Sequence, residues 1–402
     1  MKRIVIIGAG AAGLTAAETL KQQGYQSVVV LEKSDHAGGK CCSPEYQGNV
    51  YELGAGFVSN HNRAVLKLVQ RYQVPTAVVE YGKSILVDAQ PKTIGQKLKT
   101  VRELLTYLTL VRRYRTVAQP GWVHVDPAVC VPFAEFAKQH HMEWLAEELA
   151  LYFTGFGYDY FATIPAAYVL KYYSWPLLKA RLQKKMYIFP QGIQHLWTTV
   201  AKQHDVRYHT VIQQIKRADT ITITTTEGEL ECDDLIIASP LDEALEYLDA
   251  HADEHTLFSK IEYCDYRTYA VRLDDFPKAS GFLPGNYTPD RMGSPVYWYH
   301  RHADTNLYTF YVLGDWKITD EQVLANIVAM VKPFGGTIVK TEVIKHWKYF
   351  PHVNGDVMRS GFFDQVEKLQ GQHHTYYVGE VMNFSTVGLT AEYAERLVQR
   401  FF

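Results

Sequence analysis

The feature that most constrains this chain is a run of glycines between a short apolar segment and a helical one. Residues 4–7 are Ile-Val-Ile-Ile, Gly8-Ala9-Gly10-Ala11-Ala12-Gly13 follows, and residues 14–23 have a helical pattern. Gly8 permits a tight turn, Gly10 lets the backbone approach a pyrophosphate, and Gly13 lets the helix pack closely on the strand. Phosphates bind at such a helix N-terminus. The pattern predicts the first βα unit of a dinucleotide-binding fold.

The next predicted strand supplies an acidic residue at the spacing that this fold uses. Glu32 directly follows the predicted strand over residues 27–31 and lies 19 residues beyond Gly13. A carboxylate there accepts hydrogen bonds from ribose hydroxyls and repels a 2′-phosphate. Lys33 follows directly and is included in the predicted cofactor site.

Two further motifs distinguish between nicotinamide and flavin dinucleotides. Gly38-Gly39-Lys40 and Tyr51-Glu52-Leu53-Gly54-Ala55 resemble the continuation found in the flavoprotein group of amine oxidases and phytoene desaturases. Tyr376-Tyr377-Val378-Gly379-Glu380, a helix over about 390–399 and the middle segment 206–240 also resemble elements of that group. The resemblance implies FAD, which we expect to be bound without a covalent link. The predicted cofactor-binding residues are Gly8, Gly10, Ala12, Gly13, Glu32, Lys33, Gly39, Lys40, Gly54, Ala55, Gly379, Glu380 and Leu389.

These segments predict an α/β fold in which the flavin domain is discontinuous. We expect a Rossmann-like FAD-binding domain from residues 1–79, 187–258 and 350–402. Residues 80–186 are expected to be mainly helical, and residues 259–349, with alternating apolar positions, to form an antiparallel sheet. Both insertions would contribute to the substrate side. Because no second glycine fingerprint occurs, we expect the substrate itself to reduce the flavin.

Composition excludes several other classes. The 402 residues carry a formal charge of −2, which gives no overall electrostatic signature of nucleic-acid binding. No apolar run approaches the ~20 residues that cross a bilayer, and residues 4–7 are too few for a signal peptide. Five cysteines, odd in number and without zinc spacing, predict neither a disulfide framework nor a metal site. We expect a cytoplasmic protein; its oligomeric state is left open.

Aromatic residues are concentrated in one segment. Residues 152–175 contain ten aromatic side chains in 24 positions. Such a cluster is compatible with ordinary core packing, and also with an apolar cavity whose ring faces stabilise a cation.

Several segments together resemble the bacterial polyenoic fatty acid isomerases. They are residues 36–46, the aromatic segment, Tyr299-His300-Arg301-His302-Ala303-Asp304 and Tyr349-Phe350-Pro351-His352-Val353, and the likeness covers essentially the whole chain. It implies FAD-dependent conversion of linoleic acid to a conjugated isomer. In that chemistry a carbon between two double bonds loses hydride to flavin N5, and hydride returns to another carbon of the system. The cycle needs neither a nicotinamide domain nor a general base.

The same resemblance implies roles for individual residues. Phe156 is the first candidate for stabilising the substrate cation, with Phe153 and Tyr168 as further catalytic candidates and Tyr158 as a substrate contact. Lys83 corresponds to the basic residue that holds the substrate carboxylate. Arg181 stands where the family has an aromatic gate residue, and this difference affects the expected chain length and regiochemistry. Both residues are equally compatible with a solvated surface position.

Two other functions remain open at this stage. One is an amine oxidase-like oxidase or desaturase. Leu389 argues against amine substrates, because amine oxidases resemble one another in an aromatic cage and a tyrosine of that cage would be expected at this position. The other is a flavin-holding protein without turnover. Residues 97–115 carry six basic side chains and one acid around an apolar stripe, which fits a solvated helix face or a peripheral contact with a membrane surface. Cys41 and Cys42 are interpreted as packing beside the flavin.

Overall fold

The first apolar segment forms the central strand of a five-stranded parallel sheet in the computed structural model, which describes residues 2–79, 84–88, 92–183 and 185–402. Every neighbouring pair is parallel, and the central strand is almost continuously apolar, as a strand covered on both faces requires. The order is β19 (Thr375–Tyr377), β13 (Asp234–Ile237), β1 (Arg3–Ile7), β2 (Ser27–Leu31) and β9 (Asp205–Arg207).

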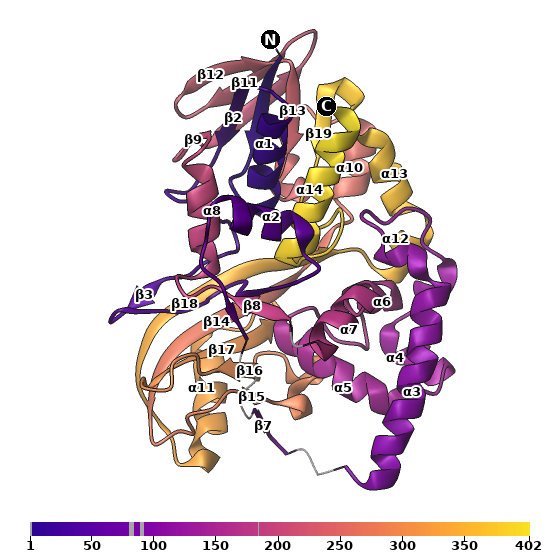
Figure 1. Ribbon diagram of the computed structural model, residues 1–402, viewed down its shortest axis with the longest axis vertical. Coiled ribbons are helices and arrows are strands. Elements are labelled where there is room, and N and C mark those ends of the chain that lie inside the picture. The colour runs from indigo at the N-terminus through magenta and orange to yellow at the C-terminus, as the bar shows by residue number, and fades with distance from the viewer. Residues whose placement is uncertain (1, 80–83, 89–91, 184) are drawn as a thin grey trace.

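Both ends of the chain meet on this sheet. The first and last helices, α1 (Ala11–Gln22) and α14 (Val387–Phe401), pack against each other, and the N- and C-termini lie close together at the top of Figure 1. The Tyr25 hydroxyl donates to the Phe402 carbonyl at 2.9 Å. The surrounding elements are α2 (Arg63–Arg71), α8 (Ile193–Ala201), β10 (Ile212–Arg217), β11 (Ile221–Thr225), β12 (Gly228–Cys232), α9 (Leu241–Ala244), α10 (Ala252–Phe258), α12 (Gly355–Arg359), α13 (Phe362–Leu369) and η7 (Gln372–His374).

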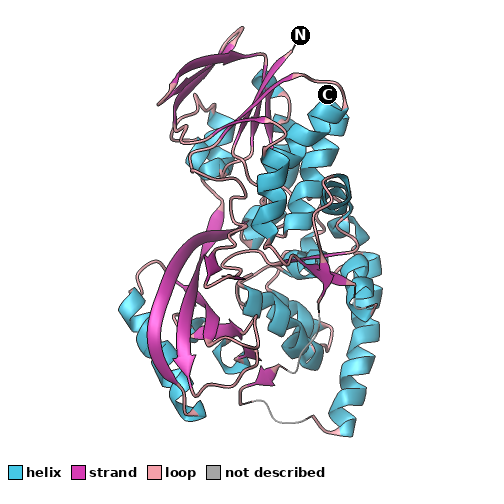
Figure 2. Ribbon diagram, turned by 60° about the vertical axis from the view of Figure 1, so that its left-hand side comes forward, coloured by secondary structure: helices cyan, strands magenta, loops and turns pink. Residues whose placement is uncertain are grey.

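A second, largely antiparallel sheet lies below the first, and its two longest strands curve through Figure 2. Its order is β18 (Thr337–His352), β14 (Glu262–Asp274), β17 (Leu307–Gly314), β16 (Pro295–Tyr299), β15 (Gly281–Phe282) and β7 (Ile85–Leu86). Helix α11 (Asp320–Val331) contributes Val323, Ile327 and Val331 to the apolar core on this sheet. The short 3-10 turns are η4 (Pro284–Asn286), η5 (Pro289–Arg291) and η6 (Lys332–Phe334).

The helical insertion lies beside the antiparallel sheet. It consists of α3 (Ile94–Arg113), η1 (Arg115–Ala118), η2 (Pro127–Val129), α4 (Phe133–Gln139), α5 (Glu143–Phe153), η3 (Thr154–Phe156), α6 (Ala166–Tyr172) and α7 (Trp175–Leu182). Two small sheets complete the fold: β3 (Glu45–Tyr46) with β4 (Asn49–Val50), and β5 (Phe57–Ser59) with β8 (Met186–Ile188) and β6 (Ala77–Val78).

This architecture confirms the predicted α/β class, and each of the three predicted flavin segments contributes strands to the parallel sheet. The first helix begins earlier than expected, since Gly10 is its N-cap. The last begins at Val387 because the Thr386 side chain accepts a hydrogen bond from the Leu389 amide and caps it. Strand β7, inside the segment expected to be helical, instead extends the antiparallel sheet.

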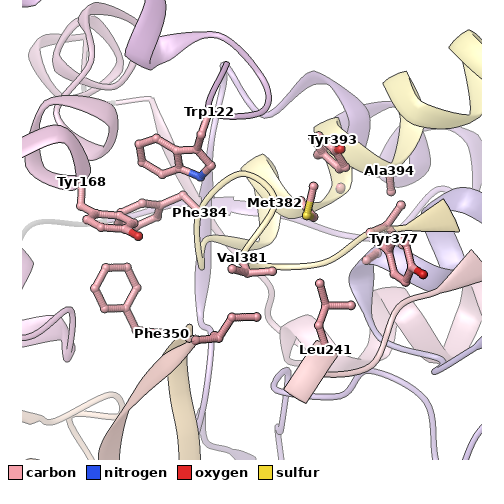
Figure 3. Close-up of a cluster of buried hydrophobic side chains, with 14 of the residues drawn as sticks. Trp122, Tyr168, Leu241, Phe350, Tyr377, Val381, Met382, Phe384, Tyr393 and Ala394 are labelled. Atoms are coloured by element: carbon pink, nitrogen blue, oxygen red, sulfur yellow. The ribbon is translucent and has the colours of Figure 1, made fainter. Parts of the chain in front are cut away.

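The helical insertion and the C-terminal segment share one hydrophobic core. Trp122 and Phe350 contact Tyr168 at ring-centroid distances of 4.9 and 5.4 Å, and Phe384 packs on Phe350 at 5.2 Å (Figure 3). This cluster holds the aromatic segment in a fixed position relative to the parallel sheet.

Candidate active site

A cavity of about 1,910 Å³ connects the carboxyl edge of the parallel sheet with the antiparallel sheet. Its wall on one side contains the glycine turn, Glu32 and Gly379, and on the other side aromatic residues of the antiparallel sheet. Ligands of open α/β sheets bind beyond the carboxyl ends of the strands. The part of the cavity beside the glycine turn therefore lies where a dinucleotide is expected.

The glycines of the first turn differ in what they do. Gly8 has φ +104°, which favours glycine, and a Cβ on Gly10 would meet only the Gly39 Cα, at 4.0 Å. Both line the cavity, as does Ala12. A Cβ on Gly13 would lie 2.0 Å from the Gly8 carbonyl oxygen, so Gly13 is needed for close packing and does not line the cavity.

Glu32 holds the glycine turn as well as facing the cavity. Its Oε2 accepts a hydrogen bond from the Ala9 amide and its Oε1 accepts one from the Ser34 amide, each at 2.8 Å. Lys33 also lines the cavity, with its Nζ 3.4 Å from the Glu243 carboxylate. The predicted ribose-binding carboxylate is therefore fixed in place by backbone donors.

The second glycine motif meets the C-terminal motif across the cavity wall. Lys40 Nζ donates to Glu380 Oε2 at 2.9 Å and lies 5.9 Å from the centre of the Tyr349 ring. A Cβ on Gly54 would lie 2.0 Å from the Lys40 carbonyl oxygen, which fixes the approach of these two loops. Gly39, Ala55 and Gly379 line the same wall.

The N-terminus of α14 faces this part of the cavity. Val387, Gly388 and Leu389 line it, and the positive end of the helix dipole favours negative charge there. Ser385 Oγ and His61 Nε2 belong to lining residues, yet both atoms are buried and lack a hydrogen-bond partner among the described residues. Open glycines, orphaned polar atoms and a helix N-terminus together fit a bound flavin dinucleotide.

The opposite wall is a series of six stacked tyrosines, which we call the tyrosine stack. Successive rings lie 4.9–6.3 Å apart with interplanar angles of 21–28°. All six line the cavity, in the spatial order Tyr158, Tyr349, Tyr266, Tyr311, Tyr297 and Tyr299. Four neighbouring strands bring five of these rings together, because β18, β14, β17 and β16 pair in that order, and the sixth, Tyr158, comes from the segment after η3.

Burial disfavours ionisation of the phenols that the four strands contribute to the tyrosine stack. Burial raises the pKa of Tyr266, Tyr311 and Tyr349 well above the ordinary value. Burial likewise raises the pKa of the Cys41 and Cys42 thiols, which also line the cavity beside the glycine motif. This wall therefore presents ring faces and protonated groups to the cavity.

Phe156 joins the two parts of the cavity. Its ring lies 5.4 Å from Phe57, which follows the Gly54-Ala55-Gly56 turn directly, and 5.7 Å from Tyr297 of the tyrosine stack. Phe156 and Tyr158 both line the cavity.

The other two catalytic candidates lie behind the wall. Phe153 and Tyr168 are not among the described lining residues, and both are almost fully buried. Phe153 packs against Tyr158 at 5.4 Å, and the Tyr168 hydroxyl accepts a hydrogen bond from the Val353 amide at 2.9 Å. Phe153 ends α5, Phe156 ends η3 and Tyr168 lies in α6, and of the three only Phe156 lines the cavity.

Neither of the two basic residues predicted to contact the substrate has a side chain in the described part of the structure. Lys83 lies outside the described residues. Arg181 belongs to α7, and its side chain lies outside the described part of the structure. Lys278 is an exposed basic residue that lines the cavity.

Sequence reasoning missed most of the substrate wall. Five aromatic residues line the cavity although the sequence analysis did not predict them as site residues: Tyr266, Phe282, Tyr297, Tyr311 and Trp347. The alternating apolar pattern of residues 259–349 predicted an antiparallel sheet. Which face of each strand meets the cavity depends on sheet register, for which the sequence carries no local signal.

A buried ion pair was also missed. Arg301 Nη1 lies 3.1 Å from Glu52 Oε1, and both side chains are almost fully buried in the cavity wall. Burial raises the pKa of Glu52 although Arg301 and the Ser43 hydroxyl favour its ionised form. The pair connects the second glycine motif to the loop after β16.

Comparison with known proteins agrees with this geometry. The family described as flavin containing amine oxidoreductase matches residues 11–356. Beta-cyclopiazonate dehydrogenase of Aspergillus flavus is 24% identical over 98% of this chain and 92% of its own length.

Two solved structures extend the comparison. The conjugated-linoleic-acid (CLA)-producing fatty acid isomerase of P. acnes is 31% identical, with a TM-score of 0.93 over 100% of this chain and 99% of that chain. An engineered putrescine oxidase is 16% identical, with a TM-score of 0.78 over 99% of this chain and 98% of that chain, a similarity of fold.

Proposed function

The chain belongs to the flavin containing amine oxidoreductase family and is a flavin-dependent enzyme, and we propose that it isomerises polyunsaturated fatty acids, converting linoleic acid to a conjugated isomer. The observation that carries this proposal is the 31% identity to the CLA-producing fatty acid isomerase over the whole chain. The largely aromatic wall of the cavity supports it, since an acyl chain needs an apolar surface.

We propose that the cofactor is FAD, bound without a covalent link. Gly8, Gly10 and the start of α1 would receive the pyrophosphate, Glu32 the ribose, and the Lys40–Glu380 pair and α14 the remainder. When bound, FAD supplies reversible hydride exchange: the carbon between two double bonds loses hydride, and another carbon of the same system gains it.

The ring faces act on the positive charge that the substrate carries between these two transfers. Phe156 lies where the cofactor side and the tyrosine stack meet, and a ring face stabilises a cation by about 0.5–2 kcal/mol. Tyr158 adds a second ring that lines the cavity. Phe153 packs against Tyr158 from behind, and Tyr168 packs on Phe350, which in turn contacts Tyr158.

A basic side chain at the cavity opening would bind the fatty-acid carboxylate. Lys83 and Arg181 remain candidates for this contact, and Lys278 joins them because it is exposed and lines the cavity. Lys83→Ala and Lys278→Ala should each raise KM for linoleic acid while flavin content stays unchanged. Unchanged KM in one variant removes that lysine from the substrate site.

Anaerobic incubation of the purified holoenzyme with linoleic acid tests the activity. An isomerase forms a conjugated diene, detected by its ultraviolet absorbance, over many turnovers without net bleaching of the flavin. Gas chromatography of the product then gives the double-bond positions. Absence of the conjugated product would contradict the proposal.

An oxidase or desaturase is the second candidate, because a dehydrogenase matches 98% of this chain. Under the same anaerobic conditions such an enzyme reduces its flavin once and stops. Addition of oxygen or a quinone would restore turnover and produce a more unsaturated product instead of an isomer.

A further inference from the structure

Helix α3 exposes a row of large apolar side chains to solvent. Ile94 is 79% exposed, Leu98 66%, Val101 56% and Leu105 61%. Steps of four, three and four residues place all four on one stripe of the helix. Among the described residues, no other helix exposes more than one large apolar side chain. We call this stripe the outer face of α3.

The opposite side of α3 already supplies the packing that a helix needs. Tyr107, Leu110 and Val111 are buried there, and Glu103 accepts a hydrogen bond from the Leu145 amide at 2.8 Å. A surface helix ordinarily has a single apolar stripe, directed to the core. The outer face is therefore a second apolar stripe that the fold leaves without a partner within the described chain.

Charge on the exposed surface of this helix has one sign. Its only acid, Glu103, is 3% exposed and turned inward. The exposed charged residues are all basic: Lys97, Lys99, Arg102, Arg112 and Arg113. Lys97 and Arg102 flank the apolar stripe, and their long stems can follow an apolar surface while the charges reach outward. Lys92, just before the helix, is already paired with Glu148 at 2.8 Å.

We propose that the outer face of α3 binds an anionic lipid bilayer, with the helix lying in the plane of the interface. Apolar side chains entering the acyl boundary and basic side chains at the level of anionic headgroups form the pattern of an interfacial helix. A second copy of the chain would bring the same five basic residues together, so charge favours lipid. None of the described helices has the length and apolarity to cross a membrane, which agrees with a surface contact.

The position of α3 gives this contact a use, which rests on the proposed function. The Tyr107 hydroxyl donates to the carbonyls of Val169 and Tyr173, each at 3.4 Å. Ser174, Pro176 and Leu177, which follow directly, line the cavity. At the right-hand edge of Figure 1, α3 thus lies between the proposed bilayer and a segment of the cavity wall. The contact would hold the enzyme at the bilayer in which its proposed substrate dissolves.

Flotation of the purified holoenzyme with vesicles tests the proposal. The wild type should bind phosphatidylcholine vesicles that contain phosphatidylglycerol more tightly than phosphatidylcholine alone, and salt should weaken this binding. The double variant Leu98→Gln/Leu105→Gln should partition about tenfold less. Val328→Gln, which changes a 50% exposed residue of α11, is the matched control and should bind like the wild type.

Three outcomes would overturn the proposal. They are a wild type that stays with the soluble fraction, a double variant that floats as the wild type does, and a lipid-free dimer that the double variant dissociates. The last would assign the stripe to a second copy. Turnover of linoleic acid dispersed without vesicles, measured in parallel, should be equal in all three proteins. Its absence in all of them would reject the proposed activity and leave the vesicle result valid.

Discussion

The two parts of the cavity are built from different parts of the polypeptide. On the flavin side the wall is mainly backbone, shaped by Gly8, Gly10, Gly39 and Gly54, with charged side chains held in fixed pairs. On the substrate side the wall is mainly rings that come from four strands and the segment after η3. The backbone wall keeps its shape because side chains are absent there, whereas the ring wall depends on which side chains are present. Substitutions on the flavin side should therefore change mainly stability and flavin binding, and substitutions on the substrate side mainly turnover.

The largest effect is expected from a side chain added directly behind the backbone wall, at Gly13. Gly13→Ala places a Cβ about 2 Å from the Gly8 carbonyl oxygen, so strand and helix must separate. The free energy of unfolding should fall by roughly 3 kcal/mol or more, and the flavin should be lost. Chemical denaturation and visible absorbance of the purified protein measure the two quantities.

Gly285→Ala is the matched control for this change. A Cβ there meets nothing within 4 Å. Equal stability and equal flavin content of the two variants would contradict the role given to close packing at Gly13.

On the ring wall the expected effect is on turnover. Phe156→Leu keeps an apolar side chain but removes the ring face, so kcat should fall about tenfold while FAD remains bound. Phe153→Leu removes a ring that packs behind the wall, and should mainly lower stability, by on the order of 1–2 kcal/mol. If both variants lose turnover to the same extent at equal stability, the distinction between wall and support is wrong.

A smaller effect should follow loss of the ion pair between the two flavin motifs. Lys40→Met removes the partner of a half-buried Glu380, and FAD affinity should weaken by about fivefold. Titration of the apoprotein with FAD measures this change. Lys67→Met breaks the ion pair of Lys67 with Glu395 outside the cavity and should leave FAD affinity unchanged.

The smallest effect on flavin binding and turnover is expected at Glu18, which does not line the cavity. Burial alone would raise its pKa, but hydrogen bonds from His204, Tyr72 and Arg71 lower it to about 2, from an ordinary value of 4.5. A carboxyl whose folded-state pKa is lowered stabilises the protein above pH 4.5, and this contribution is lost as the pH falls towards 2. Glu18→Gln should flatten the decline of Tm over that interval, whereas identical slopes would exclude this contribution.

The same contrast explains how much the sequence could predict. The glycine turn, Glu32 and the helix after Gly379 were identifiable, because their conformations follow from residues close together in the chain. The α/β class followed from these motifs and from the periodicity of the insertions. The sequence analysis predicted close packing at Gly13, where a Cβ would lie 2.0 Å from the Gly8 carbonyl oxygen; it also included Gly13 among the flavin-binding residues, and Gly13 does not line the cavity.

For the ring wall, the sequence showed that aromatic residues are concentrated in one segment, but not which of their rings face the cavity. Residues 152–175 indicated a concentration of rings, but Phe156 faces the cavity while Phe153 faces the core, and one helical turn separates the two outcomes. Tyr266 and Tyr311 come together through the pairing of β14 with β17, across more than forty intervening residues. The outer face of α3 was seen as an apolar stripe, yet its exposure depends on which side of the helix the rest of the chain covers.

The contact between Lys40 and Glu380 spans 340 positions of the chain. During synthesis at ~5–20 residues per second, the lysine emerges on the order of half a minute before its partner exists. Until then β19 is missing from the edge of the parallel sheet and α14 is missing from the cavity. The residues of the first glycine turn are therefore synthesised long before Gly379, Glu380 and the N-terminus of α14 can complete the flavin side of the cavity.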